Sequence, residues 1–227
     1  MYSRDRLLIL DADGTTIDAF SAMEKAFAHH GMDIGDLDRF QKRRHMFKYL
    51  GGLKEFPTNL ARHMGRRKRA LLIETLTEIY REETCLYDGI ADLIGLLLED
   101  RYVRVGILTR NITNEPTETL RRLFHRNGID PDGFDFFVHI PLKEDKTEHF
   151  KAIRQHFSVN PARSYACGDE KKDFVAAVQT GMHPFMVSYG FEDFDRLTAK
   201  SGVPPELIAR DPAELSLRVA NALDLRG

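Results

Sequence analysis

Residues 6–15 of the chain, RLLILDADGT, join an apolar run to two aspartates and a glycine. Short apolar runs bounded by turn residues are typical of buried strands, so we expect a strand over Arg6 to Leu10. Asp11 and Asp13 are two positions apart, and residues at this spacing on a strand face the same side. Both carboxylates can therefore point into one crevice. The alternative is a plain turn or helix cap after the strand, because Asp and Gly favour such positions.

The alternation of apolar runs with amphipathic segments continues through most of the chain. Because strands that alternate with helices are typical of a covered parallel sheet, this order predicts an α/β fold, a Rossmann-like parallel sheet with helices on both faces. Two short helices are expected in the tail beyond Pro204. The other expected strands are Tyr102–Leu108, Phe134–Val138, Ser164–Cys167 and Phe185–Val187, and the expected helices are Asp88–Glu99, Glu115–Arg126, Thr147–Phe157 and Phe174–Thr180.

Residues 18–85 interrupt this alternation, because no strand pattern appears among them. The Ser-Ala-Met-Glu motif that begins at Ser21 predicts a capping box at the start of a helix, which Gly31 would end. We therefore predict an all-helical insert over residues 18–85, after the first strand of a core formed by residues 1–17 and 86–227. Its other expected helices are Asp36–Leu50, a short one after Pro57, and Arg67–Arg81.

The charge of the chain is close to neutral overall but unevenly distributed. A formal net charge of −2 over 227 residues gives no general attraction to nucleic acid or anionic membranes. Residues 39–69 nevertheless hold 11 Lys or Arg and one acid, Glu55. Such a block is either a solvated helix face or a surface that meets an anion, such as a second anionic group of a substrate. Because the basic run Arg66–Arg69 has no interleaved aromatic residues, we expect no nucleic-acid partner.

Hydropathy and cysteine usage indicate a cytoplasmic protein. The longest apolar stretch, near Leu93–Leu98, is about six residues, whereas a bilayer span needs roughly 20. The four apolar residues before Asp11 are too few for the core of a signal peptide. Cys85 and Cys167 lie far apart without the spacing of metal ligands, which favours a reducing compartment. We therefore expect no membrane association.

Polar side chains follow further predicted strands or begin a predicted helix. Ligands of open α/β sheets bind outside the carboxyl ends of the strands, so we expect these side chains near Asp11 and Asp13. Taken singly, a threonine here is a turn hydroxyl and a lysine is a solvated one. The residues are Thr109, Arg110 and Asn111 after the second strand, Lys143 and Lys146 at the start of a helix, and Asp169 and Asp173 after the strand that ends at Cys167.

The order of these motifs resembles the haloacid dehalogenase-like superfamily, in its phosphatase branch. The resemblance is carried by Asp-x-Asp-Gly-Thr at 11–15, Thr109, a lysine near 146 and Gly-Asp-x-x-x-Asp at 168–173. It covers nearly the whole chain, and the helical insert is similar to the cap that closes over active sites of that superfamily. The usual Lys-Pro pattern is missing, so Lys143 and Lys146 both stand as candidates for the active-site lysine.

The resemblance implies phosphoryl transfer by Asp11 and Asp13. Asp11 is implied to be the nucleophile and to form an aspartyl-phosphate, and a carboxylate needs no activating base because it is ionised at neutral pH. Asp13 is implied to protonate the departing alkoxide and then to take a proton from the attacking water. Dehalogenase-type relatives lack this acid, so Asp13 favours the cleavage of phosphate esters.

The resemblance also implies a Mg²⁺ ion at these carboxylates. Two like charges 4 Å apart cost about 4 kcal/mol at an effective dielectric of 20, and a divalent cation offsets this repulsion. Oxygen ligands with spare water positions suit Mg²⁺. The implied metal residues are Asp11, Asp13 through its main-chain carbonyl, Asp169 and Asp173. The implied substrate-binding residues are Thr109, Arg110, Asn111 and Lys146, of which Thr109 and Lys146 join Asp11 and Asp13 in catalysis.

The predicted activity is therefore Mg²⁺-dependent hydrolysis of a small organic phosphate monoester. A phosphomutase uses the same motifs and is the first alternative. A protein of this superfamily that binds or regulates, with incidental hydrolysis, is the second. The expected partner is a small phosphorylated metabolite, and phosphoglycolate, sugar phosphates and nucleotides all stay open.

Overall fold

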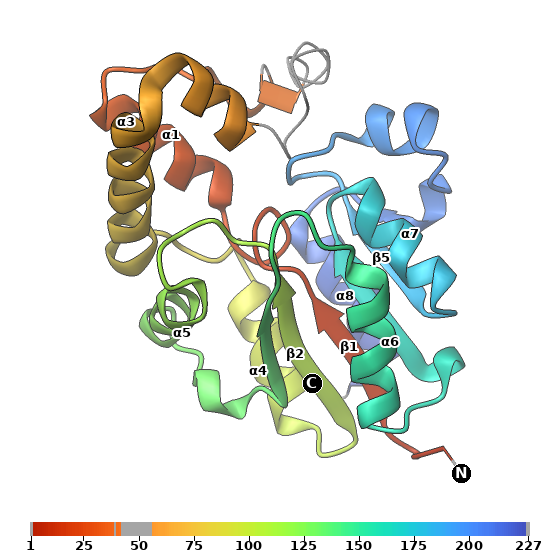
Figure 1. Cartoon of the computed structure of the whole chain (residues 1–227). Helices are drawn as coiled ribbons and strands as arrows, with labels where there is room; N and C mark the ends of the chain where they lie inside the picture. Colours follow the sequence, from red (N-terminus) through yellow and green to blue (C-terminus); the bar gives the residue numbers. More distant parts are fainter. Residues whose placement is uncertain (1, 39, 42–55, 226–227) are drawn as a thin grey trace.

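A computed structural model of the chain describes residues 2–38, 40–41 and 56–225, with side chains from Lys68 onward in the last range. In this part of the chain six parallel strands form one sheet in the order β3-β2-β1-β4-β5-β6. The predicted α/β class and parallel sheet are confirmed (Figure 1). The strands are β1 (Arg6–Leu10), β2 (Val103–Thr109), β3 (Phe136–His139), β4 (Ser164–Gly168), β5 (His183–Val187) and β6 (Ile208–Ala209).

The strand β1 lies inside the sheet and is buried on both sides. Its side chains alternate between two apolar clusters: Leu7 and Ile9 pack on one face, and Leu8 and Leu10 on the other. All four are at most 1% exposed. This is why the sequence shows a continuous apolar run here instead of the alternation of a strand with one wet face.

Helices cover both faces of the sheet, as the sequence predicts (Figure 1). The helices α6 and α7 contact each other, and α7 packs on β4 and β5, whereas α4 packs on β2 and α8, and α8 packs on β5. Phe150 of α6 belongs to the same cluster as Leu7, and Leu93 of α4 and Leu215 of α8 belong to the same cluster as Leu8. The helices are α4 (Ile90–Glu99), α5 (Pro116–Arg126), α6 (Lys146–His156), α7 (Lys171–Gln179) and α8 (Pro212–Ala222).

The order of the strands creates a crevice at the carboxyl ends of β1 and β4. The chain adds β2 and β3 on one side of β1 and then crosses to place β4 on the other side. Ligands of open α/β sheets bind where the order reverses in this way. Asp11 and Asp169 directly follow these two strands, so the topology alone brings the first and the last sequence motif together.

Several element boundaries differ from the prediction. The helix α7 begins at Lys171 rather than Phe174, because Glu170 and Asp173 form a capping box. The strand β5 begins at His183 rather than Phe185. Pro184 is tolerated there because β6 pairs only with Met186 and Val187, so that β5 is an edge strand at the proline.

The tail was predicted as two short helices and contains a sixth strand as well. The strand β6 is only two residues long, too short to give a hydropathy pattern, and it precedes α8. Short helical turns at Arg196–Lys200 and Pro205–Leu207 come before it. Two short helical elements therefore lie in the tail as predicted, the turn at Pro205–Leu207 and the helix α8, and only the strand β6 was missed.

The helical insert lies beyond the carboxyl end of the sheet, with α1 (Ala19–His29) packed against α3 (Phe56–Glu82) (Figure 1). The two helices predicted after Pro57 and over Arg67–Arg81 are one helix, α3. Gly65 lies inside it, and a helical glycine costs only about 1 kcal/mol, which is too little to end a packed helix. Of the predicted helix Asp36–Leu50, residues 37, 38, 40 and 41 are helical, residue 36 is not, and the remainder lies outside the described residues.

The chain passes between core and insert at two adjacent points. The Asp18 amide donates to the Cys85 carbonyl (3.1 Å) and the Tyr87 amide donates to the Thr16 carbonyl (3.1 Å). The predicted boundaries of the insert, residues 18 and 85, fall on these paired segments and stay a prediction. Among the described residues, no helix combines the length and the apolar character that crossing a membrane requires.

Candidate active site

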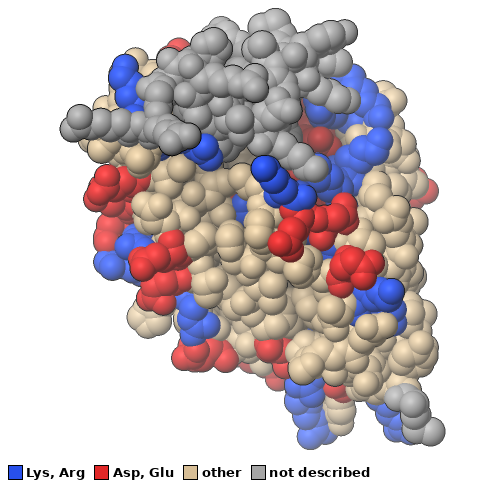
Figure 2. All heavy atoms as spheres, viewed as in Figure 1, with Lys and Arg blue, Asp and Glu red and all other residues tan. Residues whose placement is uncertain are grey.

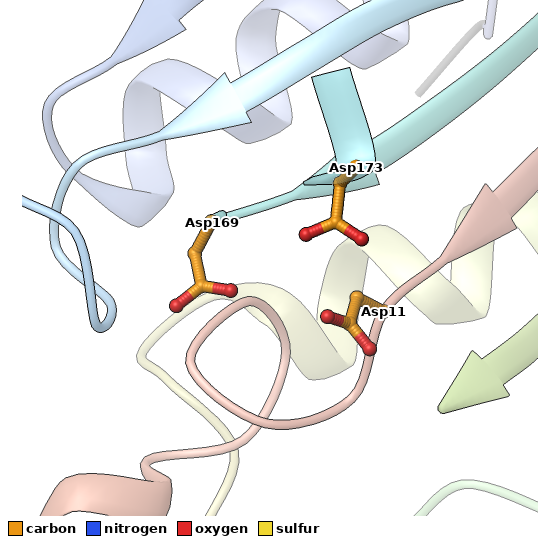
Figure 3. A group of neighbouring side chains, drawn as sticks. All are labelled: Asp11, Asp169 and Asp173. Carbon is orange, nitrogen blue, oxygen red and sulfur yellow. The ribbon is translucent and has the colours of Figure 1, made fainter. Parts of the chain in front are cut away.

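Three aspartates converge at the carboxyl ends of β1 and β4. One carboxylate oxygen from each of Asp11, Asp169 and Asp173 lies within 4.8 Å of the other two. Asp11 follows β1, Asp169 follows β4, and Asp173 lies in the first turn of α7 (Figure 3). The three side chains point toward one another although about 160 positions separate Asp11 from the other two. The structure therefore brings three of the predicted metal residues together.

Lys146 joins this cluster and Lys143 does not. The Lys146 Nζ lies 2.8 Å from Asp11 Oδ2 and 2.7 Å from Asp173 Oδ1, and its side chain is 1% exposed. Asp145 caps the helix α6 by accepting from the Thr147 amide (2.8 Å), which fixes Lys146 as the first helical residue. Lys143 is exposed. Position therefore separates the two lysines that the sequence left open.

Burial perturbs the charges of this cluster. It raises the pKa of Asp11 to about 7, with Lys146 acting in the opposite direction. It also raises the pKa of Asp169, and the neighbouring Glu170 and Asp11 raise it further. Burial lowers the pKa of Lys146, but Asp11 and Asp173 outweigh this effect and hold the pKa above its ordinary value. The lysine therefore stays charged, and the carboxylates gain from any further cation.

Glycines allow the backbone to approach the aspartates closely. A Cβ at Gly168 would overlap the Asp173 side chain, and a Cβ at Gly190 would overlap the Gly14 carbonyl and the Asp169 carboxylate. Gly14 also has a φ of +77°, a conformation that favours glycine. Gly14 and Gly168 adjoin the acidic motifs in the sequence and Gly190 approaches them through the fold, and a side chain at any of the three would displace a carboxylate.

Asp13 lies in the same cavity but has different partners. Its Oδ1 accepts from the Tyr80 hydroxyl (2.8 Å), and the Asn111 Nδ2 donates to both Oδ1 and Oδ2 (3.0 Å each). Burial raises the pKa of Asp13, and the hydrogen bonds from Tyr80 and Asn111 oppose that shift. Asn111 was expected to bind substrate. Its side-chain amide holds Asp13, and a role in substrate binding stays a prediction.

Thr109 and Arg110 lie at the end of β2, beside the aspartates. Thr109 is fully buried, and its hydroxyl accepts a hydrogen bond from the backbone N–H of Asn111 (3.1 Å). Arg110 forms an ion pair with Glu170 (3.1 Å). A guanidinium next to a phosphate site can bind two phosphate oxygens at once, but here Glu170 already occupies one of its nitrogens. Both residues line the cavity, as the sequence led us to expect.

The cavity has a volume of about 110 Å³ and receives side chains from core and insert. Its lining combines the carboxylates and Arg110 with apolar side chains such as Ile112 and Phe191. The insert contributes Met23 of α1 and Leu76 and Tyr80 of α3. The described lining residues are Asp11, Asp13, Met23, Leu76, Tyr80, Thr109, Arg110, Ile112, Leu142, Asp169, Glu170, Lys172 and Phe191.

The aspartate cluster fits a small divalent cation. Asp169 is 0% exposed; its Oδ2 accepts from the Phe191 amide (2.6 Å), but its Oδ1 has no hydrogen-bond partner among the described residues. A buried carboxylate oxygen without a partner is costly unless something else binds it. It lies with the other two carboxylates in a set of oxygen donors, the kind that Mg²⁺ prefers.

Two residues of this site, Tyr80 and Phe191, were not predicted from the sequence. Tyr80 carries no motif, and only its place on the buried stripe of α3 with Leu72 and Leu76 could have indicated that its hydroxyl needs a partner. Phe191 contributes through its backbone amide, which no sequence pattern reveals. Both residues reach the aspartates only through tertiary packing.

Comparison with known proteins supplies a family. The family model described as haloacid dehalogenase-like hydrolase matches residues 8–187 of the chain. This range runs from within β1 to the end of β5 and includes all the aspartates of the cluster. No curated protein matches the sequence.

Solved structures share the fold at low identity. A provisionally assigned β-phosphoglucomutase from Thermotoga maritima is 16% identical with a TM-score of 0.67, covering 95% of this chain and 99% of that one. A haloacid dehalogenase-like hydrolase from Streptococcus pneumoniae is 18% identical with a TM-score of 0.63, covering 95% and 99%. CbbY from Rhodobacter sphaeroides, in complex with phosphate, is 22% identical with a TM-score of 0.59, covering 83% and 88%. At these identities the likeness concerns the fold alone.

Proposed function

Because this chain belongs to the haloacid dehalogenase-like hydrolase family, we propose that it is a Mg²⁺-dependent phosphatase that hydrolyses a small organic phosphate monoester through an aspartyl-phosphate. One observation carries the proposal: Asp11 and Asp13 face one cavity, and only Asp11 also belongs to the carboxylate cluster. Two carboxylates with different surroundings can take different roles, one as nucleophile and one as acid and base.

In the first step Asp11 attacks the phosphorus of the ester. An Asp11 oxygen forms a bond to phosphorus while the bond from phosphorus to the ester oxygen breaks, and Asp13 gives its proton to the departing oxygen. Lys146 neutralises Asp11 before the attack and so lowers the repulsion between nucleophile and phosphate. The products of this step are the free alcohol and a phosphorylated Asp11.

In the second step water releases the phosphate. Asp13, now ionised, takes a proton from the water as the water oxygen bonds to phosphorus and the bond to Asp11 breaks. The enzyme then returns to its starting protonation state. The buried hydroxyl of Thr109 and the Arg110 guanidinium, both on the cavity wall, hold the phosphate oxygens through both steps.

The proposed metal ligands are the carboxylates of Asp11, Asp169 and Asp173, with the main-chain carbonyl of Asp13. Bound Mg²⁺ would supply charge neutralisation between these carboxylates and the phosphate oxygens. The orphaned Oδ1 of Asp169 supports this proposal, since it offers a buried lone pair that no described group uses.

Hydrolysis of p-nitrophenyl phosphate tests the proposal directly. We expect turnover with Mg²⁺, loss of turnover in EDTA and recovery when Mg²⁺ is added back. Asp11→Asn should reduce the rate by at least about a thousandfold because the nucleophile is lost. Asp132→Asn, which changes an exposed acid on a surface turn, is the matched control and should leave the rate unchanged. Metal-independent turnover, or full activity of Asp11→Asn, would refute the proposal.

Two other outcomes would redirect the assignment. Isomerisation of a hexose phosphate without net release of phosphate would favour the phosphomutase alternative. An absence of turnover across a panel of phosphorylated metabolites, together with tight binding of one of them, would favour a binding or regulatory protein. The same panel identifies the metabolite.

We also propose that the protein works in a reducing compartment such as the cytoplasm, without a nucleic-acid or membrane partner. The two cysteines support the reducing compartment, because Cys85 is exposed, Cys167 is buried, and both are free thiols. Mass spectrometry of protein alkylated directly in cell extract should find both thiols reduced.

A further inference from the structure

A tyrosine of the helical insert donates a hydrogen bond to a carboxylate of the core. The Tyr80 hydroxyl lies 2.8 Å from Asp13 Oδ1, and Tyr80 is 2% exposed. Tyr80 belongs to α3, whereas Asp13 follows β1, so the bond crosses from the insert to the core. It connects the proposed acid and base to a part of the chain that carries none of the sequence motifs.

The hydrogen bonds of Asp13 are unequal at its two oxygens. Oδ1 accepts from both Tyr80 and Asn111, whereas Oδ2 accepts only a share of the Asn111 amide. A carboxylic proton is disfavoured on an oxygen that already accepts two donors, because the proton would compete with them. Protonated Asp13 therefore carries its proton on Oδ2. The donors at Oδ1 also fix the rotation of the carboxyl group.

Tyr80 is a dependable donor. Burial raises its pKa well above the ordinary value for tyrosine, and the charge of Asp13 raises it further. The hydroxyl is therefore the donor of this pair. Its hydrogen bond to Asp13 is made by the tyrosine as donor in both protonation states of Asp13.

The helix α3 is held in the place that this bond requires. Leu72, Leu76 and Ile79 recur at helical spacing with Tyr80 and are buried. The neighbouring Thr77 hydroxyl accepts from the Asn114 amide (2.9 Å), which ties α3 to the core loop after β2. A shift of α3 away from the core would break the bond from Tyr80 and leave Asn111 as the remaining donor.

We propose that Tyr80 is a positioning residue for Asp13: its hydroxyl fixes the Asp13 carboxyl group and directs the acidic proton to Oδ2, so that proton transfer to the leaving group depends on the placement of α3. This inference rests on the proposed phosphatase function. In the step concerned, the Oδ2 proton passes to the ester oxygen as its bond to phosphorus breaks, and Asp13 recovers a proton from water in the next step. Tyr80 itself exchanges no proton.

The test compares two aryl phosphates that differ in their need for an acid. Phenyl phosphate releases a basic phenolate that needs protonation, whereas p-nitrophenyl phosphate releases a much weaker base. The measured quantity is kcat/KM, which includes every step up to departure of the leaving group. We expect Tyr80→Phe to lower kcat/KM for phenyl phosphate by about 10–100-fold, as for partial loss of a general acid. The factor by which kcat/KM falls for p-nitrophenyl phosphate should be at least about fivefold smaller.

Tyr87→Phe is the matched control. Tyr87 is another partly buried tyrosine, at one of the two points where the chain passes between core and insert, and it is in edge contact with Tyr189 (4.8 Å between ring centroids). The hydrogen bonds given above for Asp13 do not include it. This variant should change both substrates equally and slightly. A selective loss with Tyr87→Phe, or an equal loss for both substrates with Tyr80→Phe, would overturn the inference.

A double-mutant cycle covers the case in which Tyr80→Phe also loosens the fold. In the Asp13→Asn background the Tyr80→Phe change should no longer alter the ratio of kcat/KM between the two substrates, because the acid is already absent. A ratio that still changes would show that Tyr80 acts without Asp13 and would overturn the inference. If the wild type hydrolyses neither substrate, the proposed function fails and takes the inference with it; if the wild type is active, only the inference is at stake.

Discussion

The strand ends of the sheet and the helical insert line the same cavity in different ways. The strand ends supply charge: Asp11 after β1 and Asp169 after β4, with Arg110 after β2. The insert supplies apolar side chains, Met23 and Leu76, and a single hydroxyl from Tyr80 among its described residues. The core therefore holds the charged groups to which we assign the reaction, and the insert completes the lining around them.

The difference follows from how each region is fixed. A residue that follows a buried strand has its position set by the hydrogen-bonded ladder of the sheet, so charged groups can be held close together despite their repulsion. A helix packed through an apolar stripe is fixed less directly. Substitutions in the core should therefore change the chemical rate, and most substitutions in the insert should change binding or stability instead.

After the loss of the proposed nucleophile itself, the largest effect should come from the buried lysine of the core. Lys146→Met removes the cation that contacts both Asp11 and Asp173 and leaves two buried carboxylates unpaired. We expect turnover of p-nitrophenyl phosphate to fall at least about a hundredfold. Without metal, the free energy of unfolding should fall by about 3–5 kcal/mol, as for breaking a buried ion pair. Kinetics and chemical denaturation in EDTA measure the two effects.

Lys143→Met is the control for this prediction. Lys143 is exposed and lies three residues earlier in the chain, so its loss should change neither quantity appreciably. The opposite result, with Lys143 essential and Lys146 dispensable, would mean that the lysine of the site was misidentified and that the contrast between buried core charges and the rest of the chain is wrong.

The acidic motifs were predictable because they follow apolar runs. Asp11 and Asp169 each follow a strand that its apolar run predicts. The parallel topology then brings the two residues together. The choice between Lys143 and Lys146 was not predictable, since it depends on which residue the Asp145 cap makes the first of α6. Tyr80 was not predictable because it lies inside the helix α3, carries no motif, and reaches Asp13 only through the packing of that helix on the core.

In the fold too, the elements with a clear sequence pattern were predictable and those that depend on tertiary packing were not. The sheet and its two layers of helices follow from strongly periodic segments, and these were predicted with the right type. The strand β6 was missed because two residues carry no period, and its pairing with Met186 and Val187 is a tertiary event. The helix α3 was divided because Gly65 is a weak breaker whose effect packing overrides.

An intermediate effect should come from the glycine that backs Asp169. A Cβ at Gly190 would overlap the Gly14 carbonyl, which is backbone, and the Asp169 carboxylate. Gly190→Ala must therefore displace the carboxylate. We expect the Mg²⁺ concentration for half-maximal activity to rise about tenfold or more, as when the support of a metal ligand is disturbed. A titration of activity with Mg²⁺ measures it.

Gly95→Ala separates this local effect from the general cost of changing a glycine. A Cβ at Gly95 has no neighbour within 4 Å, and the residue lies inside α4, where alanine is the better helix former. Its Mg²⁺ requirement should stay at the wild-type value. If Gly190→Ala also leaves the Mg²⁺ requirement unchanged, Asp169 does not serve the metal through the geometry described above.

The smallest effect should come from the basic block of the insert, residues 39–69. Most side chains of this block lie outside the described residues, and on the described part of the face shown in Figure 2 acidic and basic side chains are mixed. Lys68, at the end of the block, is exposed, so water already solvates its charge. If the block is a solvated face, Lys68→Gln should change kcat/KM less than about twofold.

The substrate should decide between the two interpretations of this block. A surface that meets a second anion would show a loss with Lys68→Gln that is confined to a hexose bisphosphate, is absent with p-nitrophenyl phosphate, and shrinks as ionic strength rises and the Debye length falls toward about 8 Å. A solvated face predicts the same small change for both substrates at every salt concentration. Lys68 and Lys146 carry the same group, and burial against two carboxylates is what separates them, so a substrate-selective loss at Lys68 would show that the insert contributes charge as well as shape.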